Sequence, residues 1–170
     1  MAPSLNEWIR TFRDLHLKVK TAALSEEEGL TYQAAQLELT SVLVNVINAS
    51  AFSGLSPRKS LRIGLETEVT LWYNKKALVG KTWDVGIGGF GAGFDSDFLI
   101  PSNKGEIVDF SLKLPGEIGP ALGKGKIVSV IPKQSRTRVA LAYDDVTTHT
   151  RKRISAAVWD QILATFFKDS

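Results

Sequence analysis

The chain has 170 residues, of which 44% are hydrophobic and 23% charged, a composition typical of a soluble globular protein. Its net charge of +3 comes from 21 basic and 18 acidic residues, too small an excess to indicate DNA binding. The absence of cysteine excludes disulfides and thiolate chemistry. No apolar stretch is long enough to span a membrane and no signal peptide is evident, so we expect a cytoplasmic protein without membrane insertion.

The first fifty residues predict two helices. Residues 4–20 carry apolar side chains at helical spacing, and a second helix is expected from residue 25 to about 49. Each begins with a serine followed three residues later by a glutamate, a capping-box pattern formed by Ser4 with Glu7 and by Ser25 with Glu28. The connection over residues 21–24 is short, which predicts an antiparallel helical hairpin.

The end of the second helix is apolar around most of its circumference, which predicts burial on most sides. The residues concerned are Val42, Leu43, Val44, Val46 and Ile47. They would pack within the chain, our preferred interpretation, or against a second copy in a homo-oligomer.

A break rich in Gly, Ser and Pro over residues 51–57 predicts a domain boundary, with a helical extension at 1–52 and a second domain at 53–170. Residues 63–73 then alternate between apolar and polar, as in a half-buried strand. A turn is expected at 74–76. Further strands are expected at 77–85, 90–94, 107–114, 125–131 and 137–143, and a final helix at 148–167. No long helix interrupts the strands, so the fold class is mainly β with helices (α+β), built on a six-stranded antiparallel barrel.

Gly86, Gly88 and Gly91 match the spacing of a dinucleotide-binding fingerprint. That motif requires a helix beginning at the glycines, and the residues that follow are poor helix formers. We therefore expect a glycine-rich strand end where another group approaches the backbone closely.

Two motifs point to ligand binding. Arg58-Lys59-Ser60-Leu61-Arg62 places two arginines three residues apart before the first strand, and Asp84-Val85-Gly86-Ile87-Gly88-Gly89 follows the second. Guanidinium forks match phosphate oxygens and the O6 and N7 edge of guanine. A carboxylate accepts from guanine N1 and N2, which adenine cannot copy. Together they suit a phosphorylated guanine nucleotide.

The paired motifs resemble the PilZ family, whose pattern is Arg-x-x-x-Arg followed by Asp or Asn-x-Ser-x-x-Gly. The resemblance covers about residues 56–165 and implies a bacterial receptor for the second messenger cyclic di-GMP, with a PilZ-like barrel closed by the C-terminal helix. It implies that Arg58 and Arg62 contact phosphate and guanine, that Asp84 binds the guanine edge, and that Gly89 leaves room for the ligand. Lys59 and Gly88 are possible additional contacts.

Gly86 departs from the family pattern, which usually has Ser there. The missing hydroxyl would remove one hydrogen bond, or about tenfold in affinity at most. The arginines lie at the expected boundary, so ligand docking would change the packing of the helices or the binding of an effector protein. The alternative is a degenerate PilZ-like interaction or oligomerisation module that binds no nucleotide.

Other chemistry finds little support in the sequence. His16 and His149 have no second ligand at metal spacing, and no nucleophile motif appears, so we expect neither a metal, a cofactor nor an enzyme. The basic cluster over residues 151–153 is interpreted as a solvated helix face, although it could reach a ligand phosphate. The four tryptophans are expected in the core; they are Trp8, Trp72, Trp83 and Trp159.

Overall fold

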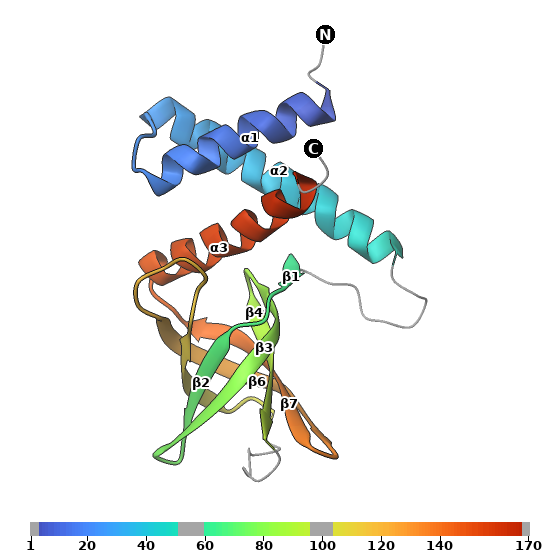
Figure 1. Ribbon diagram of the computed structural model, residues 1–170, viewed down its shortest axis with the longest axis vertical. Coiled ribbons are helices and arrows are strands. Elements are labelled where there is room, and N and C mark those ends of the chain that lie inside the picture. Colours follow the sequence, from blue (N-terminus) through green and yellow to red (C-terminus); the bar gives the residue numbers. More distant parts are fainter. Residues whose placement is uncertain (1–3, 51–59, 96–103, 168–170) are drawn as a thin grey trace. The chain divides into compact units, whose positions relative to one another are not determined.

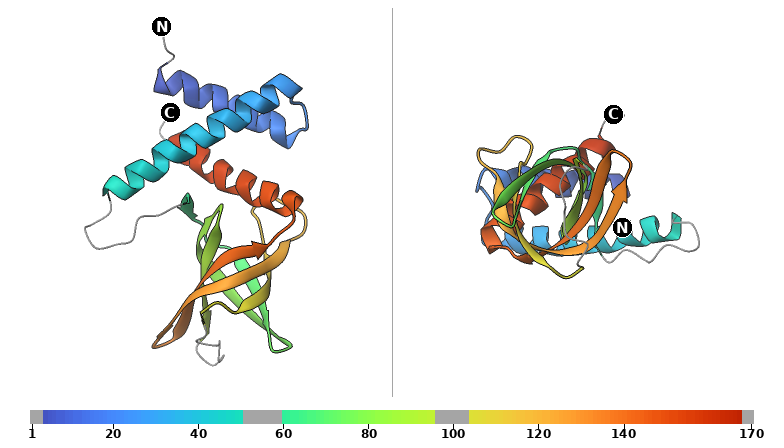
Figure 2. Two further views of the ribbon diagram at one scale, coloured as in Figure 1. Left: turned by 180° about the vertical axis from the view of Figure 1, so that it is seen from behind. Right: turned by 90° about the horizontal axis from the view of Figure 1, so that it is seen from below.

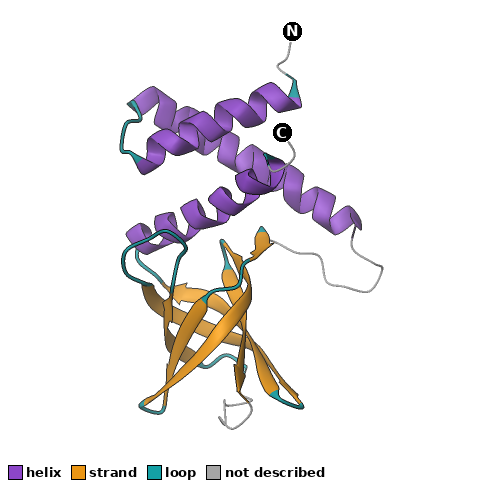
Figure 3. Cartoon of the chain, viewed as in Figure 1, coloured by secondary structure: helices purple, strands orange, loops and turns teal. Residues whose placement is uncertain are grey.

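The computed structural model describes residues 4–50, 60–95 and 104–167, which form two compact units, Met1–Leu61 and Arg62–Ser170. The expected boundary after residue 52 lies outside the described residues. Figure 1 and Figure 3 show that the first unit is helical and that the second combines strands with one helix. Among the helices in the described part of the chain, none is both long and apolar enough to cross a membrane.

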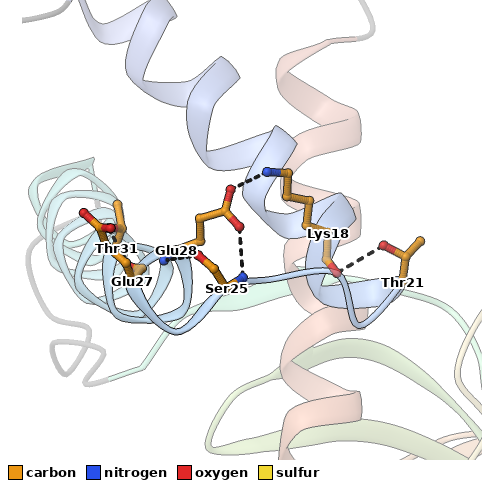
Figure 4. A network of polar contacts seen from close by, with 6 residues as sticks. All are labelled: Lys18, Thr21, Ser25, Glu27, Glu28 and Thr31. Atoms are coloured by element: carbon orange, nitrogen blue, oxygen red, sulfur yellow. Dashed lines mark hydrogen bonds and ion pairs between the residues drawn. The ribbon is translucent and has the colours of Figure 1, made fainter.

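The first unit is the predicted helical hairpin, made of α1 (Leu5–Lys20) and α2 (Glu26–Ser50) packed together. Both predicted capping boxes are present. At α1, the Ser4 amide donates to Glu7 Oε2 (2.8 Å) and the Glu7 amide donates to Ser4 Oγ (3.3 Å). At α2, the Ser25 amide donates to Glu28 Oε2 (3.0 Å) and the Glu28 amide to Ser25 Oγ (3.2 Å), as Figure 4 shows.

Charged and aromatic contacts join the two helices. The Lys18 ammonium donates to Glu28 Oε1, so Glu28 both caps α2 and pairs with α1. The Lys18 contact and the Ser25 amide hold the pKa of Glu28 below its ordinary value. Deeper in the hairpin, Tyr32 stacks on Phe12 with ring centroids 5.2 Å apart, and its hydroxyl lies 2.7 Å from His16 Nδ1.

The second unit is a closed six-stranded antiparallel barrel, as predicted. The barrel strands are β2 (Glu68–Tyr73), β3 (Lys76–Gly86), β4 (Gly89–Asp95), β5 (Ile107–Leu112), β6 (Ala121–Lys133) and β7 (Arg136–Asp145), and a short seventh strand, β1 (Arg62–Gly64), pairs with β3. The sheet runs β3-β2-β5-β6-β7-β4, and pairing of β4 with β3 closes it. The ring of strands is visible in the view from below in Figure 2.

The single strand expected at 63–73 is wrong, because it divides into β1 and β2 along one edge of β3. Gly64 lies opposite Asp84 and Glu68 opposite Lys81, so three residues of one strand face two of the other. The Thr82 hydroxyl fills this interruption. It donates to the Leu65 carbonyl (2.6 Å) and accepts from the Thr67 amide (3.0 Å). The next predicted turn is confirmed: Asn74 and Lys75 have φ of 48° and 63°, the signature of a tight hairpin.

The barrel interior is apolar and α3 (Thr148–Phe166) contacts β1, β3 and β6. The inward side chains of the strands are buried: Val69, Leu71, Leu78, Val85, Phe90, Phe94, Val108, Phe110, Leu112, Ile127, Val139 and Leu141. The Arg153 guanidinium fixes the helix by donating to the carbonyls of Gly119 (2.7 Å) and Pro120 (3.1 Å) and to Glu117. Arg153 is therefore a structural residue rather than part of a solvated face.

Candidate functional site

Two of the residues predicted from the motifs lie together where β1 meets β3. Arg62 begins β1 opposite Gly86, and Asp84 lies two residues earlier on β3. The Arg62 Nη1 donates to Asp84 Oδ1 at 3.4 Å, and the side chains are 26% and 19% exposed. The fold thus brings together two side chains that are 22 positions apart in the sequence. Both are partly shielded from water, yet both remain exposed enough to bind other groups.

The Asp84 carboxylate is held by the edge of β4. Trp83 is an extra residue in β3, because Thr82 pairs with Ala92 while Asp84 already pairs with Gly91. At this bulge the Gly91 amide donates to Asp84 Oδ1 at 2.8 Å. Within the described residues Oδ2 has no hydrogen-bond partner, which leaves one carboxylate oxygen available to a ligand.

Tyr143 lies beside this pair and was not predicted. Its ring packs near Phe90 and Phe110, and its hydroxyl is buried without a hydrogen-bond partner in the described part of the chain. Burial raises the pKa of the Tyr143 hydroxyl, while the positive charges of Arg62 and Arg151 act in the opposite direction. The hydroxyl therefore remains a neutral donor close to two cations. In the sequence, the only sign of this role was the hydroxyl of Tyr143 at an inward-facing position of a strand with alternating polarity.

Arg151 keeps the exposure expected for the basic cluster, yet its charge acts on Tyr143. It therefore belongs to the surroundings of Arg62 and Asp84, at the N-terminal turn of α3. The residues of this cluster differ in their contacts. Arg151 and Lys152 are exposed, whereas the Arg153 guanidinium donates to backbone carbonyls of the loop before β6.

The glycines of the second motif have separate surroundings. Gly86 is buried, and Gly88 is exposed in the turn between β3 and β4, where its carbonyl accepts from the Tyr143 amide at 3.0 Å. A Cβ on Gly89 would lie 2.1 Å from the Leu141 carbonyl oxygen. Close packing against β7 therefore explains why a residue without a side chain is needed at position 89. It confirms the expectation that another group approaches the backbone closely at this strand end. Roles of these glycines toward a ligand remain predictions.

The remaining predicted contacts, Arg58 and Lys59, lie outside the described residues. The prediction that all tryptophans are in the core is wrong for two of them: Trp72 and Trp83 are 42% and 41% exposed. Trp83 is turned outward because it keeps the alternation of β3, on the same face as Val79 and Lys81, and the bulge moves Asp84 to that face beside it.

No protein-family model and no curated protein sequence matches this chain. Solved structures with a similar fold include the PilZ domain of YcgR from Escherichia coli with c-di-GMP, at 14% identity and a TM-score of 0.54. That match covers 68% of this chain and 99% of the YcgR domain. The MrkH–c-di-GMP complex from K. pneumonia is 16% identical, with a TM-score of 0.57, covering 67% of this chain and 55% of MrkH.

The inhibitor of motility MotI from Bacillus subtilis is also similar, at 14% identity with a TM-score of 0.53, covering 64% of this chain and 53% of MotI. The match thus spans about half the length of MrkH and MotI. Likeness at these identities establishes the fold, and the PilZ-like barrel predicted from the two motifs is confirmed.

Proposed function

We propose that the barrel unit is a receptor for cyclic di-GMP. The observation that carries the proposal is the contact between Arg62 and Asp84, which unites the two motifs on a fold shared with c-di-GMP-bound PilZ structures. Arg62 uses one of its five N–H donors on Asp84, so the others remain for phosphate oxygens or the guanine O6 and N7 edge. Arg58 would supply the second guanidinium.

Asp84 gives the proposed site its base preference. Its carboxylate is held in place by the Gly91 amide, and the second oxygen faces no protein donor in the described residues. Guanine presents adjacent N1 and N2 donors to such a carboxylate, whereas adenine presents an acceptor at N1. The proposal therefore includes discrimination against cyclic di-AMP. Binding rather than catalysis is the expected activity, and a second messenger implies a cytoplasmic setting.

Calorimetric titration of the full chain with cyclic di-GMP tests the proposal. We expect saturable binding, at least tenfold weakening by Arg62→Ala, and little binding of cyclic di-AMP. Arg10→Ala, which removes an exposed arginine from α1, is the control and should leave affinity unchanged. Absence of saturable binding to the wild-type chain would reject the proposed function.

The expected response is a change at the junction between the two units. Arg62 is the first residue of the second unit, and the segment carrying Arg58 joins it to the first. Docking of Arg58 and Arg62 on the ligand would alter how an effector protein is bound. Hydrogen exchange over residues 51–62 should slow when cyclic di-GMP is added; unchanged exchange at saturating ligand would exclude this coupling.

A second candidate function, self-association, is favoured by exposed apolar side chains on α2. Leu30 and Leu37, which are seven residues apart, are 65% and 75% exposed. Helices that expose such a stripe commonly pair with another helix. Sedimentation of the full chain should show a dimer that Leu37→Lys dissociates, and a monomer at all concentrations would count against this candidate.

A further inference from the structure

We infer that Trp83 and Arg138 form a stacking platform for a guanine base, adjacent to Asp84 on the outer face of β4. The inference rests on the proposed nucleotide-binding function and adds two residues that lie outside both sequence motifs. The ligand class is a planar purine of a guanine nucleotide, held by its face on the platform and by its edge at Asp84.

The Trp83 indole lies flat against a glycine-bearing stretch of β4. A Cβ on Gly91 would lie 2.5 Å from Trp83 Cε2 and 2.6 Å from Cζ2 and Nε1. A Cβ on Gly93 would lie 3.9 Å from Cζ3. The ring therefore crosses β4 in contact with backbone that has no side chains. Because 41% of the residue is still exposed, part of the indole remains accessible from solvent.

The Trp83 indole and the Asp84 carboxylate both contact Gly91. Gly91 donates its amide to Asp84 Oδ1 at 2.8 Å while its Cα side supports the Trp83 ring. Both side chains leave β3 at consecutive positions because the bulge places Trp83 and Asp84 on the outer surface together. An aromatic face and a guanine-specific acceptor are thus neighbours, which is the combination that holds a base by stacking and by its edge.

Arg138 completes the platform from β7. It lies opposite Gly93, and its Cζ is 5.4 Å from the centroid of the Trp83 ring, a cation–π distance. In the part of the chain that the structure describes, Arg138 has no carboxylate partner within ion-pair distance. Its guanidinium is therefore available to a phosphate oxygen or to the O6 and N7 edge of a stacked base.

The surface beyond the indole does not extend the platform. A hollow of about 240 Å³ lies over Gly80 and Gly93, and its charged lining comes from Glu68, Lys81, Asp95 and Arg136. The two acidic and two basic groups offset one another, and Lys81 already pairs with Glu66 at 3.0 Å. This balance gives no preference for an anion, so we confine the platform to Trp83 and Arg138.

A purely structural role for Trp83 makes a different prediction. Aromatic side chains that cover strand glycines stabilise sheets, and such a role would affect folding alone. The test therefore measures ligand binding and stability together on the full chain. The matched control is Trp72→Ala, because Trp72 has nearly the same exposure and lies beside the 74–75 turn, opposite Ala77 and Asp109.

Cyclic di-GMP is the probe, followed by calorimetry and by tryptophan fluorescence. Trp83→Ala should weaken binding about 5- to 150-fold, the range for loss of one base–aromatic stack. Trp83→Phe should retain most of the affinity but lose the ligand-induced quenching expected of the wild type. Arg138→Gln should weaken binding about two- to fivefold, with an unfolding midpoint lowered only slightly by loss of the contact with Trp83. Trp72→Ala should preserve both the affinity and the quenching.

Wild-type affinity in Trp83→Ala, or quenching that persists in Trp83→Phe, would overturn the inference while leaving the receptor proposal intact. Lack of binding by the wild type would overturn both. If Trp83→Ala fails to fold, the fluorescence of the wild type and of Trp83→Phe still decides between the two roles of Trp83.

Discussion

Substitution of Asp84 separates its structural role from its proposed ligand role. Asp84→Ala removes the acceptor for the Gly91 amide and the partner of Arg62, whereas Asp84→Asn keeps an amide oxygen that accepts from Gly91. Asp84→Ala also removes every side-chain acceptor for the N1 and N2 donors of guanine, whereas Asp84→Asn keeps one acceptor oxygen, and the family pattern allows Asn at this position. Asp84→Ala should therefore be the less stable variant and should lose more ligand affinity than Asp84→Asn.

The magnitudes follow from the two contacts. Gly91 is buried, and leaving its amide without an acceptor costs about 1–3 kcal/mol. The Arg62 contact is long, at 3.4 Å, and partly exposed, so its loss adds no more than about 1 kcal/mol. Asp84→Ala should lower the free energy of unfolding by about 1–4 kcal/mol and Asp84→Asn by no more than about 1 kcal/mol. Loss of the base contact should weaken nucleotide binding roughly tenfold or more in Asp84→Ala, and less in Asp84→Asn.

Urea unfolding followed by circular dichroism measures the stability, and calorimetry with cyclic di-GMP measures the affinity. Asp109→Asn, at an exposed position on β5, is the control and should change neither. Equal destabilisation by Asp84→Ala and Asp84→Asn would refute the reasoning about the bulge. Wild-type affinity in Asp84→Ala would refute the role of Asp84 in guanine binding.

Four further predictions follow from single contacts. Gly89→Ala should destabilise the barrel by several kcal/mol in urea unfolding, because its Cβ would lie 2.1 Å from the Leu141 carbonyl oxygen; wild-type stability would contradict this. Tyr143→Phe should leave the free energy of unfolding unchanged or raise it by up to about 1 kcal/mol, since its buried hydroxyl lacks a partner in the described residues; a loss beyond that would reveal a missed hydrogen bond. Gly86→Ser should strengthen calorimetric binding of cyclic di-GMP up to about tenfold, and weaker binding would argue against the family geometry. Because the folded pKa of Glu28 is lowered from its ordinary value of 4.5, its stabilisation is present above pH 4.5 and is lost as pH falls through the folded pKa, so Glu28→Gln should lower the thermal midpoint more at pH 7 than in acid; an equal effect at pH 7 and in acid would contradict a role of the charge.

Local patterns in the sequence predicted most of the elements because their causes are local. Helical spacing and the two capping boxes gave α1 and α2 within a residue of their observed ends. The barrel followed from period-two runs without a crossover helix. The division between β1 and β2 was missed because it depends on the Thr82 hydroxyl, which bonds to Leu65 and Thr67 from the neighbouring strand. A hydrogen bond between strands leaves no periodic signal in either one.

The candidate site was predicted less completely, for the same reason. Arg62 and Asp84 were identified because their residue types carry recognisable chemistry at a recognisable spacing. Trp83 was assigned to the core from its residue type, although it alternates with Thr82 and shares the outward face of Val79 and Lys81. Tyr143 was overlooked because its significance lies in the charges around it, which come from β1, β3 and α3.

The weakness of the ion pair between Arg62 and Asp84 is itself consistent with a binding site. A structural ion pair at this position would be expected to be short and bidentate, whereas this one is a single 3.4 Å contact that ligand groups can replace at little cost. Asp84 keeps its orientation when Arg62 leaves, because the Gly91 amide holds the same carboxylate oxygen at 2.8 Å. The guanidinium is then free to turn toward a phosphate while the carboxylate stays in place for a base. Separating the pair costs less than about 1 kcal/mol, which is small beside the roughly 1–3 kcal/mol expected from each bidentate interaction with the nucleotide.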